Sequence, residues 1–125
     1  MDILISNSSG KPIYEQITNQ LKTLISSGAL AQGEALPSMR LLARELRISV
    51  ITTKRAYEEL ERDGFIETVA GKGSFVAGKN LELLREYQLQ QVEAALQKAV
   101  ELAQSSAIGC EELIEMMTLL YKEEA

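Results

Sequence analysis

The chain of 125 residues has 46% hydrophobic residues and a net charge of −5, which predicts one compact soluble domain with an extension and excludes two domains of ordinary size. It has no histidine and one cysteine, Cys110. The commonest general base, the commonest transition-metal ligand and any internal disulfide are therefore lacking. We expect no enzyme, no metal site, no cofactor and a reducing, cytoplasmic location.

The acidic charge is concentrated in the last third of the chain. Residues 1–80 hold ten basic and nine acidic side chains, whereas residues 81–125 hold three and nine. Within 40–55 there are five basic residues against one acid, Glu45. Because the local charge sets the field that a phosphate meets, this window favours an anionic partner despite the negative total. No apolar run approaches the ~18 residues of a membrane span, and no secretory signal is expected at the N-terminus.

Three helices are predicted in the first half of the chain. Pro12 is suited to a first helical turn, and apolar residues recur at helical spacing until Gly28. The loop 29–36 has room for a very short strand. Ser38 is a plausible N-cap of a brief second helix that ends near Arg47. Ser49 would cap a third helix over 50–63, and Gly64 would follow its end.

A glycine-tipped hairpin and two further helices should follow. Strands are predicted at about 65–69 and 74–77, because the tip 70–73 is rich in residues that tolerate positive φ. Helices are expected over about 80–106 and 111–124. The predicted fold class is mainly α with a small β-hairpin. It comprises a winged helix-turn-helix in residues 1–78 and a two-helix tail in 79–125.

The start of the third helix holds the candidate DNA-reading side chains, because a helix-turn-helix inserts this part into the major groove. The exposed positions are expected to be Ser49, Val50, Ile51, Thr52, Lys54 and Arg55. Thr53 should pack inward. Val50 and Ile51 either cover the local core, for instance as a hydrophobic staple, or contact thymine methyl groups. Lys54 would bond a base edge or a phosphate.

Two further cations lie outside the third helix. Arg40, near the start of the second helix, should face the DNA backbone. Lys72, on the hairpin between Gly71 and Gly73, could reach a phosphate or the minor groove. Arg44 and Arg47 are interpreted as solvated side chains.

Four motifs resemble the DNA-binding domain of the GntR family of bacterial repressors: PIYEQI at 12–17, LPSMRLLARELRIS at 36–49, TTKRAYEELERDGFIE at 52–67 and GKGSFVA at 71–77. The resemblance covers about residues 10–78. It implies DNA contacts at Arg40, Ser49, Val50, Thr52, Lys54, Gly71 and Lys72. The sequence departs from the family pattern in three places. Arg47 replaces a frequent glycine, Val50-Ile51 replaces commonly polar residues, and Thr53 replaces a usual valine.

The short helical tail resembles the YtrA branch of this family, whose members dimerise through the tail and often repress operons of ABC transporters. The resemblance therefore implies a homodimeric repressor that binds double-stranded DNA at an inverted-repeat operator. The expected dimer contacts are Leu89, Val92, Leu96, Ala99, Ala103, Leu113, Met117 and Leu120.

Two alternatives remain open at this point. The chain could be a protein-interaction adaptor that uses the winged helix and the tail without binding DNA. A pocket for an unknown small-molecule effector near Tyr87, Met116 and Met117 would modify the repressor hypothesis without replacing it.

Overall fold

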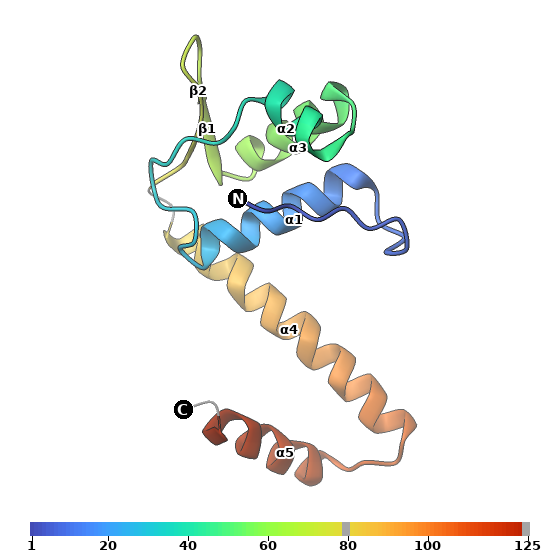
Figure 1. The fold of residues 1–125 in the computed structure, drawn as a ribbon. Coiled ribbons are helices and arrows are strands. Elements are labelled where there is room, and N and C mark those ends of the chain that lie inside the picture. Colours follow the sequence, from blue (N-terminus) through green and yellow to red (C-terminus); the bar gives the residue numbers. More distant parts are fainter. Residues whose placement is uncertain (79–80, 124–125) are drawn as a thin grey trace. The chain divides into compact units, whose positions relative to one another are not determined.

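A computed structural model describes residues 1–78 and 81–123, so the expected tail residues 79, 80, 124 and 125 lie outside the described part (Figure 1). The described residues form five helices and one two-stranded antiparallel sheet, which confirms the predicted fold class. The elements are α1 (Ile13–Ser26), α2 (Met39–Leu46), α3 (Val50–Arg62), β1 (Ile66–Val69), β2 (Gly73–Val76), α4 (Leu81–Ser105) and α5 (Cys110–Glu123). The chain divides into two compact units, Met1–Arg85 and Glu86–Ala125.

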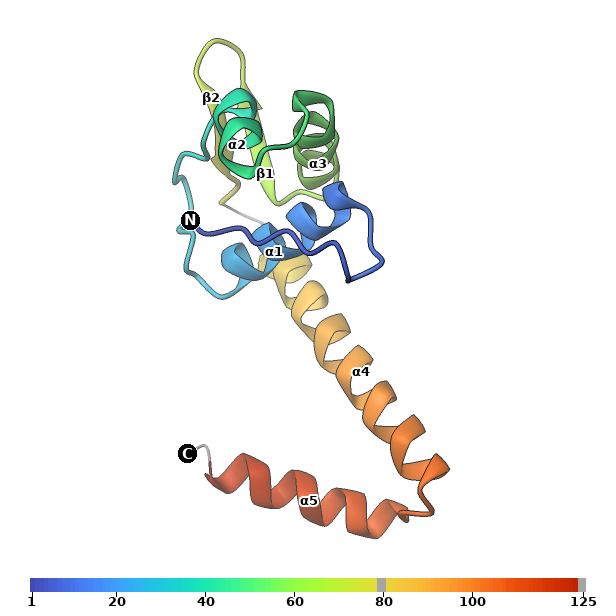
Figure 2. The same cartoon turned by 45° about the vertical axis from the view of Figure 1, so that its right-hand side comes forward.

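The core of the first unit lies where α1 and α2 both pack against α3 (Figure 2). Ile17 and Leu21 of α1 and Leu60 of α3 are fully buried there. Tyr57 is buried as well, and its hydroxyl donates a 2.7 Å hydrogen bond to the carbonyl oxygen of Pro37, before α2. Burial raises the pKa of the Tyr57 phenol well above its ordinary value. The three helices are therefore joined by apolar packing and by one satisfied polar group.

An N-terminal arm, residues 1–11, runs along α1 and is held by two glutamine side chains of that helix (Figures 1 and 2). The Gln20 amide accepts from the N–H of Leu4 (2.8 Å) and donates to its carbonyl oxygen (2.6 Å). Gln16 makes the same pair of bonds with Ser6, at 2.8 and 3.0 Å. Residues two apart on an extended strand lie at nearly the same spacing as residues four apart on a helix. Each side-chain amide therefore forms the pair of hydrogen bonds that a residue of a neighbouring strand would form with the arm.

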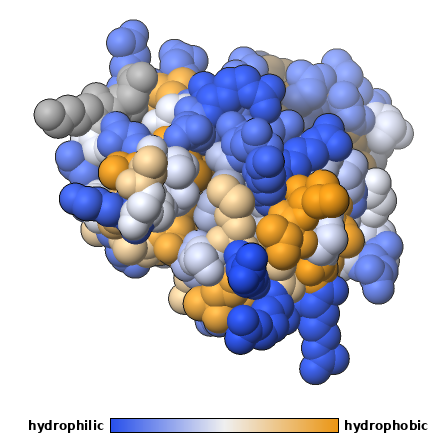
Figure 3. Space-filling view, turned by 90° about the horizontal axis from the view of Figure 1, so that it is seen from above, coloured by the Kyte–Doolittle hydropathy of each residue, from blue (hydrophilic) through white to orange (hydrophobic). Residues whose placement is uncertain are grey.

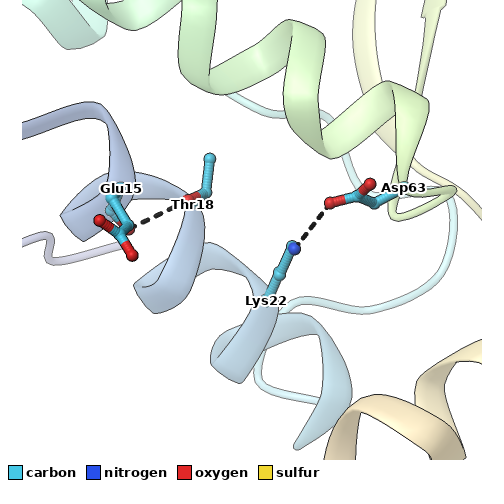
Figure 4. A network of polar contacts seen from close by, with 4 residues as sticks. All are labelled: Glu15, Thr18, Lys22 and Asp63. Atoms are coloured by element: carbon cyan, nitrogen blue, oxygen red, sulfur yellow. Dashed lines mark hydrogen bonds and ion pairs between the residues drawn. The ribbon is translucent and has the colours of Figure 1, made fainter.

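The other end of α1 is tied to the end of α3 by an ion pair (Figure 4). Lys22 Nζ lies 2.8 Å from Asp63 Oδ2 and 5.2 Å from the centre of the Phe65 ring. Figure 4 also shows the Thr18 hydroxyl, which donates to the Glu15 carbonyl oxygen within α1. The Lys22–Asp63 contact therefore joins α1 to the C-terminal end of α3, just before the wing.

The wing is the β1–β2 hairpin, in which Ile66 pairs with Val76 and Val69 pairs with Gly73. Ile66, Ser74 and Val76 are buried, whereas residues 69–73 at the tip are exposed. The expected short strand before α2 is reduced to one bridge, between Ala35 and Phe75. The hairpin is therefore anchored at its base and projects from the helices at its tip.

The second unit contains most of α4 and all of α5. Ala103 is its one buried hydrophobic residue among those described, and α5 has no buried residue. Apart from Leu113, the large apolar side chains of α5 are exposed to more than a third of their area, up to 82% for Tyr121. Two helices with this much exposed apolar surface do not bury a core of their own.

Candidate nucleic-acid interface

The turn between α2 and α3 closes through a Schellman motif with arginine at its left-handed position. The N–H of Ile48 bonds to the carbonyl oxygen of Ala43 (3.0 Å), and that of Arg47 bonds to Arg44 (3.3 Å). Arg47 has φ 58° and ψ 46°. The same hydrogen-bond pattern ends α3, where glycine, Gly64, takes the left-handed position at φ 83°. The sequence prediction that this turn lacks a residue suited to positive φ is correct, and the backbone adopts the strained conformation nevertheless.

Both helices of the motif start at the predicted serine caps. The Ser38 hydroxyl accepts a hydrogen bond from the N–H of Leu41, and the Ser49 hydroxyl accepts one from the N–H of Thr52, each at 3.1 Å. These bonds satisfy donors that the first helical turn leaves unpaired. They also fix the direction in which α3 leaves the turn.

The polar side chains of the first turn of α3 are bonded to each other. The hydroxyls of Ser49 and Thr52 lie 2.8 Å apart, in addition to the cap bond. Thr53 is fully buried, as expected, and its hydroxyl donates to the carbonyl oxygen of Ser49. Between them, Val50 and Ile51 are 46% and 80% exposed. The tip of the helix therefore presents mainly methyl groups to solvent.

Exposed cations lie on α2, on α3 and in the turn between these helices. They are Arg40, Arg44, Arg47, Lys54 and Arg55. Figure 3 views the molecule from above and shows hydrophilic side chains over much of the visible surface, with apolar groups gathered in several places. Residues 40–55 thus hold five basic side chains and one acid, Glu45, a balance of charge that suits a polyanion.

One contact of these cations was not predicted from the sequence. The Arg55 guanidinium carbon lies 3.8 Å from the centre of the Tyr14 ring, on the first turn of α1. Such stacking is a cation–π interaction, and it leaves the edge of the guanidinium able to donate hydrogen bonds. Tyr14 is thus a positioning residue for Arg55, and no signal in the sequence indicates that these two residues meet.

The wing presents Lys72 at the turn of the hairpin. Lys72, Gly71 and Gly73 are all exposed, and the N–H of Lys72 bonds to the carbonyl oxygen of Val69 (2.9 Å). Gly71 and Gly73 have φ values of 77° and 110°, which glycine adopts without strain. The tight turn therefore leaves the lysine side chain projecting from the tip.

The model of the gntR family of bacterial regulatory proteins matches residues 13–76, from the start of α1 to the end of the wing. The chain belongs to the GntR family. Its family and relatives are transcription regulators rather than enzymes, as the sequence predicts. The chain is 35% identical to the HTH-type transcriptional repressor YtrA of Bacillus subtilis, over 90% of this chain and 87% of that protein.

Solved structures of GntR-type regulators extend this likeness to the fold. A transcriptional regulator from Oenococcus oeni superposes with a TM-score of 0.79 at 25% identity, over 94% of this chain and 97% of that one. The GntR-family transcription factor YtrA from Sulfolobus acidocaldarius gives a TM-score of 0.59 at 34% identity, over 74% and 97%. The predicted resemblance to the GntR family and to its YtrA branch is confirmed.

The second unit of this GntR-family chain holds an apolar groove between α4 and α5, with a volume of about 820 Å³. Five of the residues expected at a dimer contact line it: Leu96, Ala99, Leu113, Met117 and Leu120. Leu89 and Val92 precede these residues on α4. They line a smaller hollow, which Leu96 also lines. Ala103 differs from the others, because at 6% exposure it is covered by its own chain and offers little surface to a partner.

The residues suggested for an effector pocket are only partly brought together. Met116 and Met117 line the apolar groove, whereas Tyr87 is not among its lining residues. Within residues 1–78 and 81–123, no cluster of three or more metal-binding side chains is found. None of the described helices is both long and apolar enough to cross a membrane.

Proposed function

We propose that this GntR-family chain is a homodimeric transcriptional repressor that binds an inverted-repeat operator in the bacterial cytoplasm. The observation that carries the proposal is the exposed start of α3, together with five exposed cations on α2, on α3 and in the turn that joins them. In a helix-turn-helix the second helix enters the major groove while the first crosses the backbone. The 35% identity to the repressor YtrA of Bacillus subtilis supports the regulatory role.

Within this proposal the expected DNA contacts have different roles. Lys54 reaches a base edge, and Arg40 reaches the phosphates beside the groove. Lys72, together with the backbone of Gly71, approaches the DNA from the wing. Arg55, stacked on Tyr14, donates to a phosphate. Ser49 and Thr52 act mainly by holding the helix start in place, because their hydroxyls already bond to each other.

The second unit is proposed to join two copies of the chain, so that residues 1–78 bind DNA and residues 79–125 dimerise. The absence of buried residues in α5 and the open apolar groove support this division. Burial of such surface against a second copy is favourable by about 25 cal/mol per Å². Two linked half-site binders also gain affinity, since the second contact becomes intramolecular. By the resemblance to the YtrA branch, an operon that encodes an ABC transporter is the proposed target.

The first test is selection of binding sites from random duplex DNA, followed by fluorescence anisotropy on the selected operator and on scrambled DNA over a salt series. We expect two inverted half-sites and an affinity that falls steeply with salt, because counterions are released at each phosphate contact. Lys54→Ala should lose about 1–3 kcal/mol on the operator and less on scrambled DNA, whereas Arg40→Ala should weaken both about evenly. No binding at low salt would contradict the proposal and favour the adaptor alternative.

The dimer is tested by light scattering on Leu96→Asp, which places a charge in the apolar groove. Gln97→Asp is the matched control, because the neighbouring side chain is exposed and does not line the groove. We expect Leu96→Asp alone to become monomeric and to lose the gain from the second half-site. An unchanged dimer mass would mean that the interface lies elsewhere.

Deletion of the gene should raise transcription from an operator-linked promoter, whereas a fall would identify an activator.

A further inference from the structure

The start of the recognition helix carries an unusual division of polar and apolar groups. Ser49 and Thr52, two of the three hydroxyl residues at the start of this helix, bond to each other at 2.8 Å, and Ser49 also accepts a hydrogen bond from the backbone N–H of Thr52. The Ser49 hydroxyl thus makes two hydrogen bonds within the protein, and the Thr52 hydroxyl makes one. The side chains that remain at the tip are Val50 and Ile51, 46% and 80% exposed.

Packing within the protein does not account for these two apolar side chains. A hydrophobic staple joins the residue before the N-cap to the fourth residue of the helix. With Ser49 as the N-cap, those positions are Ile48 and Thr53. Val50 and Ile51 are the first and second helical residues, outside that pair, and their exposure leaves most of Ile51 in contact with water. The staple interpretation left open by the sequence is therefore not supported.

We propose that Val50 and Ile51 recognise the 5-methyl groups of thymines in each operator half-site, an inference that rests on the proposed function because it requires α3 to enter the major groove. The surrounding cations, Arg40 and Lys54 among them, direct this apolar tip toward the polyanion. Among the four bases, thymine alone offers an apolar group on its major-groove edge. Guanine, adenine and cytosine present donors and acceptors there, and the methyl groups of valine and isoleucine would leave these unsatisfied.

The test replaces thymine by deoxyuridine, one position at a time, in the operator selected from random DNA. Deoxyuridine keeps the base pairing and the backbone and removes only the methyl group. We expect one or two thymines of each half-site to be sensitive, each with a loss of about fourfold in affinity, as for one buried methyl group. The other thymines should tolerate the change.

Protein variants assign each sensitive methyl group to a side chain. At one sensitive position each, Ile51→Ala and Val50→Ala should bind the operator with thymine and the operator with deoxyuridine equally well. The side chain that contacts that methyl group is truncated in each variant. Both side chains are exposed, so truncation should leave the fold intact. Lys54→Ala is the control, which should weaken binding yet keep the full methyl sensitivity.

The outcomes separate this inference from the proposed function. Tight, specific binding with no sensitive thymine would overturn the inference and leave the repressor proposal standing. Sensitivity that persists unchanged in both alanine variants would also overturn it, because another group would then read the methyl. Absence of any sequence-specific binding would overturn the proposed function and the inference together.

Discussion

Replacement of Arg47 by glycine should stabilise the DNA-binding unit, although it removes a side chain with a full charge. Arg47 has φ 58° at the end of α2, in the left-handed region that side chains disfavour because Cβ meets the following carbonyl oxygen. The equivalent position at the end of α3 is Gly64, with the same two hydrogen bonds around it. The fold therefore contains its own example of the relaxed motif.

The size of the effect follows from two opposing terms. The left-handed conformation costs an ordinary L-residue roughly 1–2 kcal/mol. Glycine removes this strain from the folded state. It also lowers the free energy of unfolding by about 0.4–1 kcal/mol, because it has more conformational freedom than arginine in the unfolded chain. The net gain for Arg47→Gly is about 0.5–1 kcal/mol. With a urea dependence of about 2 kcal/mol per molar, the unfolding midpoint should rise by about 0.3–0.5 M.

The assay is equilibrium urea unfolding followed by far-UV circular dichroism, since the chain has no tryptophan. Arg47→Ala is the control, because it removes the same charge but keeps the Cβ that causes the strain. We expect Arg47→Ala to stay near the parent midpoint. If Arg47→Gly were no more stable than Arg47→Ala, left-handed strain would not be the cause, and the reasoning would be refuted.

Three further predictions concern the same unit. Gly64→Ala should destabilise it more than Gly71→Ala in urea unfolding: both glycines have positive φ (83° and 77°), but only at Gly64 would the added Cβ meet a side-chain carbon, at 2.8 Å. Equal losses would contradict this. Tyr14→Leu should weaken operator and scrambled DNA alike by about two- to fivefold, because Arg55 loses its stacking partner, while Tyr14→Phe should not. Anisotropy measures both, and an unchanged Tyr14→Leu would mean that Arg55 needs no ring. Burial raises the pKa of Tyr57, so its stabilising effect is complete below about pH 10, the ordinary pKa, and is lost as pH rises further. The unfolding midpoint should therefore fall more steeply above that pH than in Tyr57→Phe, and parallel curves would contradict the assignment.

Local chemistry was enough to predict the helices and the hairpin, with ends within one or two residues of those observed. The serine caps at Ser38 and Ser49 and the glycine after α3 are found where the sequence suggested, because each satisfies groups within a few residues of itself. The wing is likewise determined by its own turn. The strain at Arg47 could also be predicted. The turn needs a positive φ at this position, and arginine, unlike glycine, does not favour a positive φ.

Contacts between distant residues could not be predicted in this way. Arg55 and Tyr14 meet only because α1 packs against α3, and nothing in either segment specifies the other. The sequence placed Ser49 and Thr52 among the DNA contacts, but it did not show that their hydroxyls would bond to each other. The exposure of Ile51, which separates its two interpretations, likewise depends on the tertiary arrangement.

The hydrogen bonds from Gln16 and Gln20 to the N-terminal arm determine which sequence changes the arm can accept. Both amides bond to main-chain atoms of Leu4 and Ser6, which every amino acid except proline would also supply at those positions. Exposed side chains of the arm can therefore be exchanged over evolutionary time while its course along α1 stays the same. A single insertion between the two bonded residues would break the match of spacings at once. The arm is thus tolerant of substitution and intolerant of changes in length.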